Sequence, residues 1–306
     1  MDTALATVQR GEITEGESVE SLAGKWIEFL DVSKTTVQDY TRAIRQFVRW
    51  LAEQNISFPT RKDVIAYRDM LKETKKPSTV QLYITAVRLF SEFLSEEFHA
   101  EDFAVHIKGA KLDHSHKKDC FTREQVKALL SADMSPRNRA MLAVMVCSGL
   151  RCIEVVRADV GDLTVFRGHS VIMVQRKGRD EKKPVKISFA VEQLIRKYLA
   201  TRENLSEDAP LFAAESNRNI DGRLTTRSLS RIIKGIFKSA GYDSPRLTAH
   251  STRHTAITLA LKAGKSLEEV AQFAGHSSIA TTLIYAHDIA EADNSCADAV
   301  SDAIFA

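Results

Sequence analysis

Apolar residues recur every three to four positions from about residue 15 to residue 98, and this spacing constrains the fold more than any other feature of the sequence. The pattern forms four segments separated by turn signals, which include Pro59 and Pro77. Apolar side chains at this spacing line one face of an α-helix, whereas a half-buried strand requires strict alternation. The first hundred residues therefore predict a small helical domain.

Two of the four segments begin with a serine, a residue that caps helices well. The helix predicted after Ser33 has an apolar stripe made of Val37, Tyr40, Ile44, Phe47 and Leu51. The helix predicted after Ser78 repeats the design with Val80, Ile84, Val87, Phe90 and Leu94. Another face of the first helix carries Arg42, Arg45 and Arg49, which predicts contacts with a phosphate backbone. Ordinary solvent-exposed arginines are the alternative interpretation.

The spacing changes to alternation between Asp162 and Ser188. Three short runs, LTVF, SVIMVQ and PVKIS, are separated by Gly168 and by a turn around residues 177–180. They predict a three-stranded antiparallel sheet. Helical spacing resumes at Val191 and returns in segments up to residue 304, with one segment ending at Tyr285 and the last spanning 289–304. The predicted fold class is mainly α with a small antiparallel β-sheet in the C-terminal domain.

Composition excludes several classes of protein. The chain has 306 residues, 44% of them hydrophobic and 27% charged, which is typical of a globular protein with two domains. The longest apolar run, residues 140–150, is too short to cross a bilayer and predicts a buried helix. The four cysteines lack CxxC spacing and indicate reduced thiols of a cytoplasmic protein rather than disulfides or zinc ligands.

The run KGAKLDHSHKKD, residues 108–119, is polar and basic without periodicity, as in a domain linker. We therefore expect a flexible tail at 1–14, a helical DNA-binding domain at 15–107, a linker at 108–118 and a second domain at 119–306. Lys117 and Lys118 are expected to meet phosphate groups. The net charge of +3 permits nucleic-acid binding without the strongly basic character of many DNA-binding modules.

Local charge is more informative than the total. Between Arg167 and Lys186 there are seven basic residues against two acidic ones. Within this excess Arg176 and Arg179 flank Lys177, and both arginines are predicted to bind DNA. A solvated charged hairpin is the alternative interpretation.

Three separated groups of residues bear chemistry. The first is a Gly-Leu-Arg turn that ends at Arg151, with Glu154 three positions later. The second joins His250 and Arg253, and the third is Gly275-His276 followed nine residues after the histidine by Tyr285. Each group alone is weak, since a lone histidine, arginine or tyrosine is more often structural. Their order and spacing, with Lys177 at a predicted hairpin tip between the first two, are harder to dismiss.

Taken together, these groups resemble the tyrosine recombinases of the phage integrase family, and in particular the short two-domain Xer-like members, over roughly residues 15–288. The resemblance implies a helical core-binding domain followed by a catalytic domain with a C-terminal helix. Departures are small: Ala274 precedes Gly-His and Thr252 precedes the second arginine, where leucine is common at both positions. These are supporting positions, so they affect packing before chemistry.

The resemblance implies a catalytic set, which is Arg151, Lys177, His250, Arg253, His276 and the nucleophile Tyr285, with Glu154 in support. The residue types also suit the reaction on chemical grounds. Transfer of a phosphodiester to a hydroxyl requires a nucleophile, cations around the non-bridging oxygens and a proton donor for the leaving oxygen. Tyr285 supplies the first, the two arginines with His276 the second, and Lys177 the third. His250 is expected to move the tyrosyl proton, and Glu154 to orient an arginine or His250.

The set predicts a site-specific DNA recombinase that works through a 3′-phosphotyrosyl intermediate without metal, ATP or another cofactor. Its expected partner is double-stranded DNA, on which a homotetramer assembles at paired sites; accessory proteins stay open. A zinc site is the competing interpretation of His250 and His254, but Ser251 stands where the HExxH motif needs glutamate. His254 is instead expected to pack or to form a hydrogen bond.

Three other functions are weighed: a type IB topoisomerase-like enzyme, a DNA-binding regulator without activity, and a hydrolase that uses the histidines. The short chain and the two motifs disfavour the topoisomerase. A regulator would not require Tyr285, His276 and Lys177. After Tyr285, an apolar stripe of Ile289, Ala292, Cys296, Ala299 and Ala303 needs a cover, which is either a neighbouring protomer or its own domain.

Overall fold

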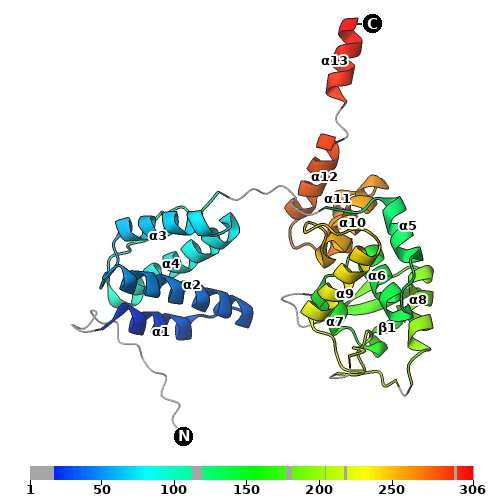
Figure 1. Cartoon of the computed structure of the whole chain (residues 1–306), viewed down its shortest axis with the longest axis horizontal. Helices are drawn as coiled ribbons and strands as arrows, with labels where there is room; N and C mark the ends of the chain where they lie inside the picture. The colour runs from blue at the N-terminus through cyan, green and yellow to red at the C-terminus, as the bar shows by residue number, and fades with distance from the viewer. Residues whose placement is uncertain are drawn as a thin grey trace. The chain divides into compact units, whose positions relative to one another are not determined.

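The computed structural model describes residues 17–111, 119–176, 181–203, 205–216, 219–292 and 295–305. Contacts divide the chain into two compact units, Met1–Asp113 and His114–Ala306 (Figure 1). The division falls between residues 113 and 114, within the run predicted as a linker. The finer domain boundaries stay predictions, and the predicted tail at 1–14 lies outside the described residues.

Within residues 17–111, the first unit consists of four helices, which are α1 (Val19–Phe29), α2 (Lys34–Glu53), α3 (Arg61–Thr74) and α4 (Pro77–Phe98). Ser33 caps α2 as predicted, because its hydroxyl accepts a hydrogen bond from the backbone N–H of Thr36 at 3.3 Å. The cap predicted at Ser78 is wrong. Pro77 is the first residue of α4 and Lys76 is its cap, since a proline fits the first helical position, where no N–H is needed.

Aromatic side chains fill the core of the first unit. The rings of Trp26 and Phe90 lie 5.8 Å apart, and those of Phe47 and Tyr67 lie 4.9 Å apart, all four being buried. Such pairs add to the stabilisation from buried area. Because Phe47 belongs to the inward stripe of α2, the opposite side of that helix is left to solvent, and there lie Arg42, Arg45 and Arg49.

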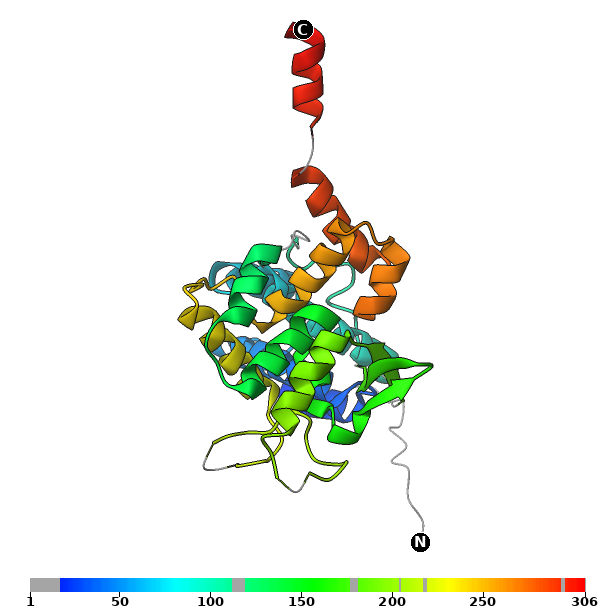
Figure 2. The same ribbon diagram turned by 90° about the vertical axis from the view of Figure 1, so that its right-hand side faces the viewer.

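The second unit is built around two buried helices, α6 (Pro136–Ser148) and α10 (Ala249–Lys262), which contact each other (Figure 1 and Figure 2). Residues 140–146 of α6 are all buried, as the apolar run predicted, and so are residues 251–257 of α10. Around them lie α5 (Arg123–Ser131), α7 (Cys152–Arg157), the 3-10 turn η1 (Val160–Asp162), α8 (Phe189–Leu199), α9 (Thr226–Ser239), α11 (Leu267–Ala274) and α12 (Ala280–Ala292). The last helix, α13 (Cys296–Phe305), follows α12 in the chain.

The predicted three-stranded antiparallel sheet is confirmed. It runs in the order β1 (Leu163–Phe166), β2 (His169–Gln175) and β3 (Lys182–Lys186). Phe166 pairs with His169 across a two-residue turn in which both Arg167 (φ 49°) and Gly168 (φ 76°) are left-handed. Two left-handed residues match the twist of a hairpin. The second hairpin, between β2 and β3, includes residues 177–180, which lie outside the described residues.

The C-terminal helices differ from the prediction. Helix α12 continues past Tyr285 to Ala292, and a separate helix α13 begins at Cys296. The apolar stripe predicted over 289–304 is therefore divided between two helices. No residue of α13 is buried, and Phe305 is 84% exposed. No helix in the described part of the chain is both long and apolar enough to span a membrane.

Candidate active site

Arg151 is fixed by the turn that ends α6. Gly149 adopts the left-handed conformation (φ 62°), and a Cβ at this position would approach the ring of Phe273 to 3.2 Å. Arg151 then caps α7, where Glu154 accepts hydrogen bonds from the Arg151 backbone N–H at 2.8 Å and from its Nη1 at 2.9 Å. Glu154 is fully buried. The carboxylate thus holds both the backbone and the guanidinium of Arg151. Glu154 was expected to orient an arginine or His250, and in the structure it contacts the arginine.

The C-terminal end of α11 brings two more arginine contacts to the same place. Arg151 Nη2 donates to the carbonyl of Gly275 at 3.4 Å, although the two residues are 124 positions apart. Arg176 donates to the carbonyls of Ala274 at 2.8 Å and Phe273 at 3.3 Å. Cations suit this end of a helix because its carbonyls carry partial negative charge. A Cβ on Gly275 would lie 1.5 Å from Arg176 Nη1, so glycine leaves the space that Arg176 uses.

Arg253 is a buried cation at the centre of the site. It is 2% exposed, and its Nη1 donates to the carbonyl of Gly149 at 2.7 Å. Burial, followed by the charge of Arg151, lowers the pKa of Arg253 to about 10. Its Nη2 is buried with no hydrogen-bond partner among the described residues. A buried donor without a partner is costly, so this arrangement suits an incoming anion.

Tyr285 lies inside this cationic environment. It is 5% exposed and packs with Ile257, Val270 and Ala274. Burial raises the pKa of its hydroxyl to about 12, although the charges of Arg253 and Arg151 oppose the shift. Its Oη lies 2.7 Å from Nδ1 of His254. The hydroxyl is therefore protonated at neutral pH and already in contact with a possible acceptor of its proton.

His276 is held beside the tyrosine by a contact that the sequence did not indicate. Its Nδ1 lies 2.8 Å from Oγ1 of Thr282, a fully buried residue one helical turn before Tyr285. The His276 and Tyr285 rings are nearly parallel, with centroids 6.3 Å apart. Thr282 thereby fixes the orientation of the imidazole relative to the nucleophile. The signal available in the sequence was the spacing of three residues between Thr282 and Tyr285, which places both side chains on the same face of a helix.

His250 was expected to move the tyrosyl proton. In the structure His254 forms a hydrogen bond with the Tyr285 hydroxyl. His250 is exposed, one turn earlier on α10, and its ring meets that of His254 edge to face at 4.7 Å. The expectation that His254 forms a hydrogen bond is met. Its partner could not be read from the sequence, because Tyr285 lies 31 positions away.

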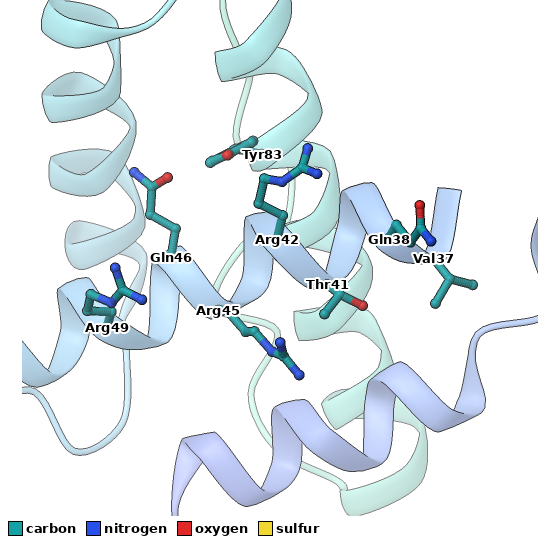
Figure 3. A pocket seen from close by; sticks show the side chains of 8 residues that line it. All are labelled: Val37, Gln38, Thr41, Arg42, Arg45, Gln46, Arg49 and Tyr83. Atoms are coloured by element: carbon teal, nitrogen blue, oxygen red, sulfur yellow. The ribbon is translucent and has the colours of Figure 1, made fainter. Parts of the chain in front are cut away.

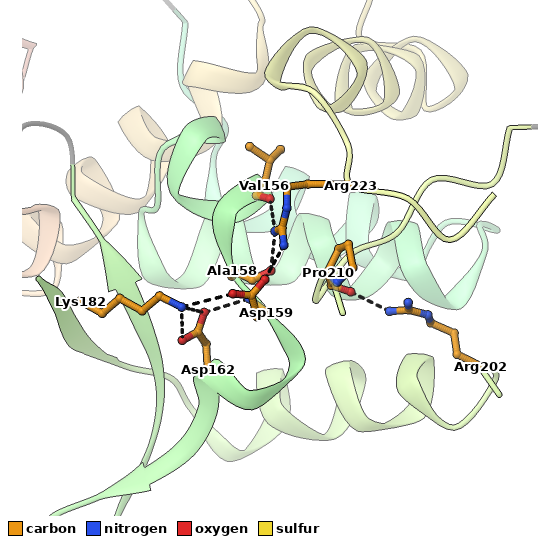
Figure 4. A network of polar contacts seen from close by, with 8 residues as sticks. All are labelled: Val156, Ala158, Asp159, Asp162, Lys182, Arg202, Pro210 and Arg223. Atoms are coloured by element: carbon orange, nitrogen blue, oxygen red, sulfur yellow. Dashed lines mark hydrogen bonds and ion pairs between the residues drawn. The ribbon is translucent and has the colours of Figure 1, made fainter. Parts of the chain in front are cut away.

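Four predicted residues, Lys177, Arg179, Lys117 and Lys118, lie outside the described residues. A neighbour of Lys177 is engaged elsewhere: Lys182 Nζ lies 2.7 Å from both carboxylate oxygens of Asp162 and 3.3 Å from Asp159 (Figure 4). Burial lowers the pKa of Lys182, but the bonds to Asp162 and Asp159 outweigh it and raise the pKa overall. Lys182 is therefore a poorer proton donor than an ordinary lysine.

The same network ties the sheet to the segment before α9. Arg223 Nη2 contacts Asp159 at 2.5 Å, and its Nη1 donates to the carbonyl of Val156 at 2.9 Å (Figure 4). Asp159 thus joins a residue of β3 to Arg223. Lys182 begins β3 and Arg176 directly follows β2, so the contacts of these two residues hold the two strands at the same end of the hairpin.

The predicted DNA-binding arginines of the first unit line a common groove, which we call the α2 groove. Its volume is about 570 Å³, and its lining residues are Val37, Gln38, Thr41, Arg42, Arg45, Gln46, Arg49 and Tyr83 (Figure 3). All lie on α2 except Tyr83, which comes from α4. Arg42 pairs with Asp39 at 3.3 Å across an exposed surface. The α2 groove thus presents three arginines on a surface between two helices.

Comparison with known proteins agrees with these features. Residues 119–291 match the model of the phage integrase family, and residues 25–100 match the model described as phage integrase, N-terminal SAM-like domain. The tyrosine recombinase XerD of Oceanobacillus iheyensis is 29% identical over 273 residues, which cover 84% of this chain and 88% of that protein. The tyrosine recombinase XerA of Pyrococcus horikoshii is 25% identical, with 90% and 91% covered.

Two solved structures show the same fold. The XerH site-specific recombinase in its post-cleavage complex with palindromic difH substrate has a TM-score of 0.70 at 22% identity, covering 86% of this chain and 80% of that one. A lambda integrase (75-356) dimer bound to a COC' core site has a TM-score of 0.67 at 16% identity, with 86% and 96% covered.

The family model covers more than half of the chain and includes every residue from Arg151 to Tyr285. The mainly helical fold, the small sheet and the family inferred from the motifs are all confirmed. This chain belongs to the phage integrase family of tyrosine recombinases, enzymes that break and rejoin DNA.

Proposed function

We propose that this protein carries out site-specific recombination by attack of Tyr285 on DNA, forming a 3′-phosphotyrosyl intermediate. One observation carries the assignment: the buried Tyr285 hydroxyl shares its surroundings with Arg253, whose buried Nη2 lacks a partner among the described residues. A phosphate placed there would give that donor an acceptor and would stand within reach of the nucleophile. Planar guanidinium groups match phosphate oxygens in both charge and geometry.

In the proposed reaction a bond forms between Tyr285 Oη and phosphorus while the bond to the 5′ oxygen breaks. Arg151 and Arg253, with His276, stabilise the negative charge on the non-bridging oxygens. Glu154 acts through Arg151, which it already holds by two hydrogen bonds. The phosphotyrosyl ester keeps the energy of the bond it replaces, so rejoining requires neither ATP nor another cofactor.

We assign the proton for the leaving 5′ oxygen to Lys177. Two neighbouring basic residues support this choice, because Lys182 is bound to Asp162 and Asp159 and Arg176 is bound to α11. His250, exposed on α10, is assigned to exchange the tyrosyl proton with water. A histidine is suited to this because its ordinary pKa lies near neutrality.

We further assign DNA contacts to the α2 groove and to Lys117, Lys118, Arg176 and Arg179. In the α2 groove Arg45 and Arg49 are the better test, because Arg42 shares its charge with Asp39. Replacing both with alanine is expected to weaken DNA binding roughly tenfold and to reduce the slope of log K against log salt by about 2. Equilibrium gel shifts at several salt concentrations measure both quantities.

The matched control removes two charges from another part of the same unit, by Lys62→Ala on α3 with Lys75→Ala directly after this helix. Both lysines are exposed. Equal losses of affinity in the two double variants would show that only net charge matters and would contradict a specific role for the α2 groove.

The chain is proposed to assemble on paired sites as a tetramer in the cytoplasm, with accessory proteins left open. Helix α13 supports assembly, since no residue of it is buried and Val300, Ile304 and Phe305 are exposed apolar side chains. Deleting Asn294 to Ala306 is expected to preserve binding to a single site and to abolish cooperative synapsis of two sites. Gel shifts with one-site and two-site DNA test this, and unchanged synapsis would contradict it.

The central test uses a suicide version of the protein's native site, with a nick beside the scissile phosphate so that the cleaved fragment leaves. Wild-type protein is expected to form a covalent adduct stable in denaturing gels, and peptide mapping is expected to place the DNA on Tyr285. An adduct on another residue, or none, would contradict the proposal. A plasmid with two sites then separates recombination from the simple relaxation expected of a topoisomerase-like enzyme.

A further inference from the structure

The hydroxyl of the proposed nucleophile, Tyr285, contacts Nδ1 of His254. The distance is 2.7 Å, which is the usual length of a strong hydrogen bond. Both residues are buried, with Tyr285 5% and His254 7% exposed. Two buried polar groups at this distance orient each other, because neither has much access to water as a substitute.

This hydrogen bond offers a path for the tyrosyl proton, because a protonated hydroxyl can donate to a ring nitrogen of a neutral imidazole. Burial raises the pKa of Tyr285 to about 12, so the hydroxyl carries its proton at neutral pH. In the tautomer of His254 that carries its proton on Nε2, the hydroxyl donates and Nδ1 accepts. This is the tautomer that transfer of the proton from Tyr285 to His254 requires.

His250 does not occupy this position, although it was the residue predicted to move the tyrosyl proton. It lies one helical turn before His254 on α10 and is exposed to solvent, with its ring against the edge of the His254 ring at 4.7 Å. The order in space is therefore Tyr285, His254, His250 and solvent. Residues four apart on a helix share a face, and this spacing places the two imidazoles in contact.

We propose that His254 holds the Tyr285 hydroxyl and takes up its proton during attack on the DNA, with His250 between it and water. In the cleavage step the Oη–P bond forms, the P–O5′ bond breaks, and the proton of Oη passes to Nδ1 of His254. The 5′ oxygen takes its proton separately, from the general acid. In rejoining, His254 returns a proton to Oη as the tyrosine leaves. This inference rests on the proposed function and assigns the base of the same site.

The test measures single-turnover cleavage of the suicide site in two forms, one with an ordinary 5′ oxygen and one with a bridging 5′ sulfur. A thiolate leaves without a general acid, so the sulfur substrate isolates activation of the tyrosine. Loss of a general base is expected to slow cleavage about 10²- to 10³-fold. His254→Ala is expected to show that loss on both substrates, whereas Lys177→Ala is expected to recover on the sulfur substrate.

Two further measurements separate proton uptake from positioning. Added imidazole is expected to restore part of the activity of His254→Ala, since it can enter the space left and accept the proton. His254→Asn keeps an acceptor near the position of Nδ1 without a basic nitrogen, so it is expected to fold and remain slow. His287→Ala, an exposed histidine two residues after Tyr285, is the matched control and is expected to cleave normally.

The outcomes are distinct. Wild-type cleavage by His254→Ala, or by His254→Asn if the alanine variant has a lowered melting temperature, would overturn the inference and leave the proposed function intact. Slow cleavage by His250→Ala with normal cleavage by His254→Ala would assign the proton to His250 instead. Failure of the wild-type protein to form any adduct would contradict the proposed function itself.

Discussion

Replacing Tyr285 with phenylalanine is expected to lower the rate of covalent protein–DNA adduct formation by a factor of at least about 10³. Single-site DNA binding is expected to stay unchanged. The substitution removes only the hydroxyl, and the ring keeps its contacts with Ile257, Val270 and Ala274. The lost hydrogen bond to His254 is expected to cost about 1 kcal/mol of unfolding free energy. Denaturing gels with the suicide site measure the adduct, and gel shifts measure binding.

Tyr242→Phe provides the control for this experiment. Tyr242 lies in the same unit, partly buried, with its ring 5.3 Å from that of Phe121. It is expected to form the adduct at the wild-type rate. An adduct formed by Tyr285→Phe at a similar level would mean that another side chain is the nucleophile.

Replacement of Arg253 is expected to have the second large effect on cleavage, because this buried cation is proposed to stabilise the negative charge on the phosphate. Arg253→Met removes the charge but nearly keeps the volume, and cleavage is expected to fall by at least about 10³-fold. The free energy of unfolding is expected to stay within about 2 kcal/mol of wild type. The lost hydrogen bond to the Gly149 carbonyl is offset by relief of a buried charge beside Arg151. Adduct assays and thermal melting measure the two effects.

Arg253→Lys separates charge from shape. Lysine keeps the charge but lacks the planar fork, so cleavage is expected to fall about 10²-fold rather than vanish. Sulfate offers an independent check, because an anion bound at Nη2, which lacks a partner among the described residues, stabilises the folded state. Sulfate is expected to raise the melting temperature of the wild type more than that of Arg253→Met. Equal shifts would indicate general salt effects and would count against an anion site at Arg253.

Much of the fold was predictable because local patterns agree with tertiary packing. The buried run of residues 140–150 became α6 and its Gly149 turn, and the alternation after Asp162 became the three strands. The errors were at helix ends. Helix α4 starts two residues earlier than predicted, since a helix end depends on which group caps it. The break between α12 and α13 lies seven residues later than predicted.

For the candidate site, the sequence predicted the residues but not all of their contacts. The motifs and the family resemblance that they carry predicted a site made of Arg151, Glu154, Arg253, His276 and Tyr285, and these residues lie together in the structure. Glu154 was close enough in sequence for its bond to Arg151 to be anticipated, since i to i+3 neighbours meet at a helix start. The hydrogen bond between Tyr285 and His254 could not be anticipated, and neither could the contact of Thr282 with His276.

The sequence by itself therefore determined the helical first unit, the small sheet, the family and the residue types of the site. Only the tertiary structure decided which groups touch. It brought the Gly149 carbonyl to Arg253, the end of α11 to Arg151 and Arg176, and His254 to Tyr285. The physical reason is separation along the chain: these contacts join residues 31 to 124 positions apart, and only the packing of α6, α10, α11 and α12 fixes such distances.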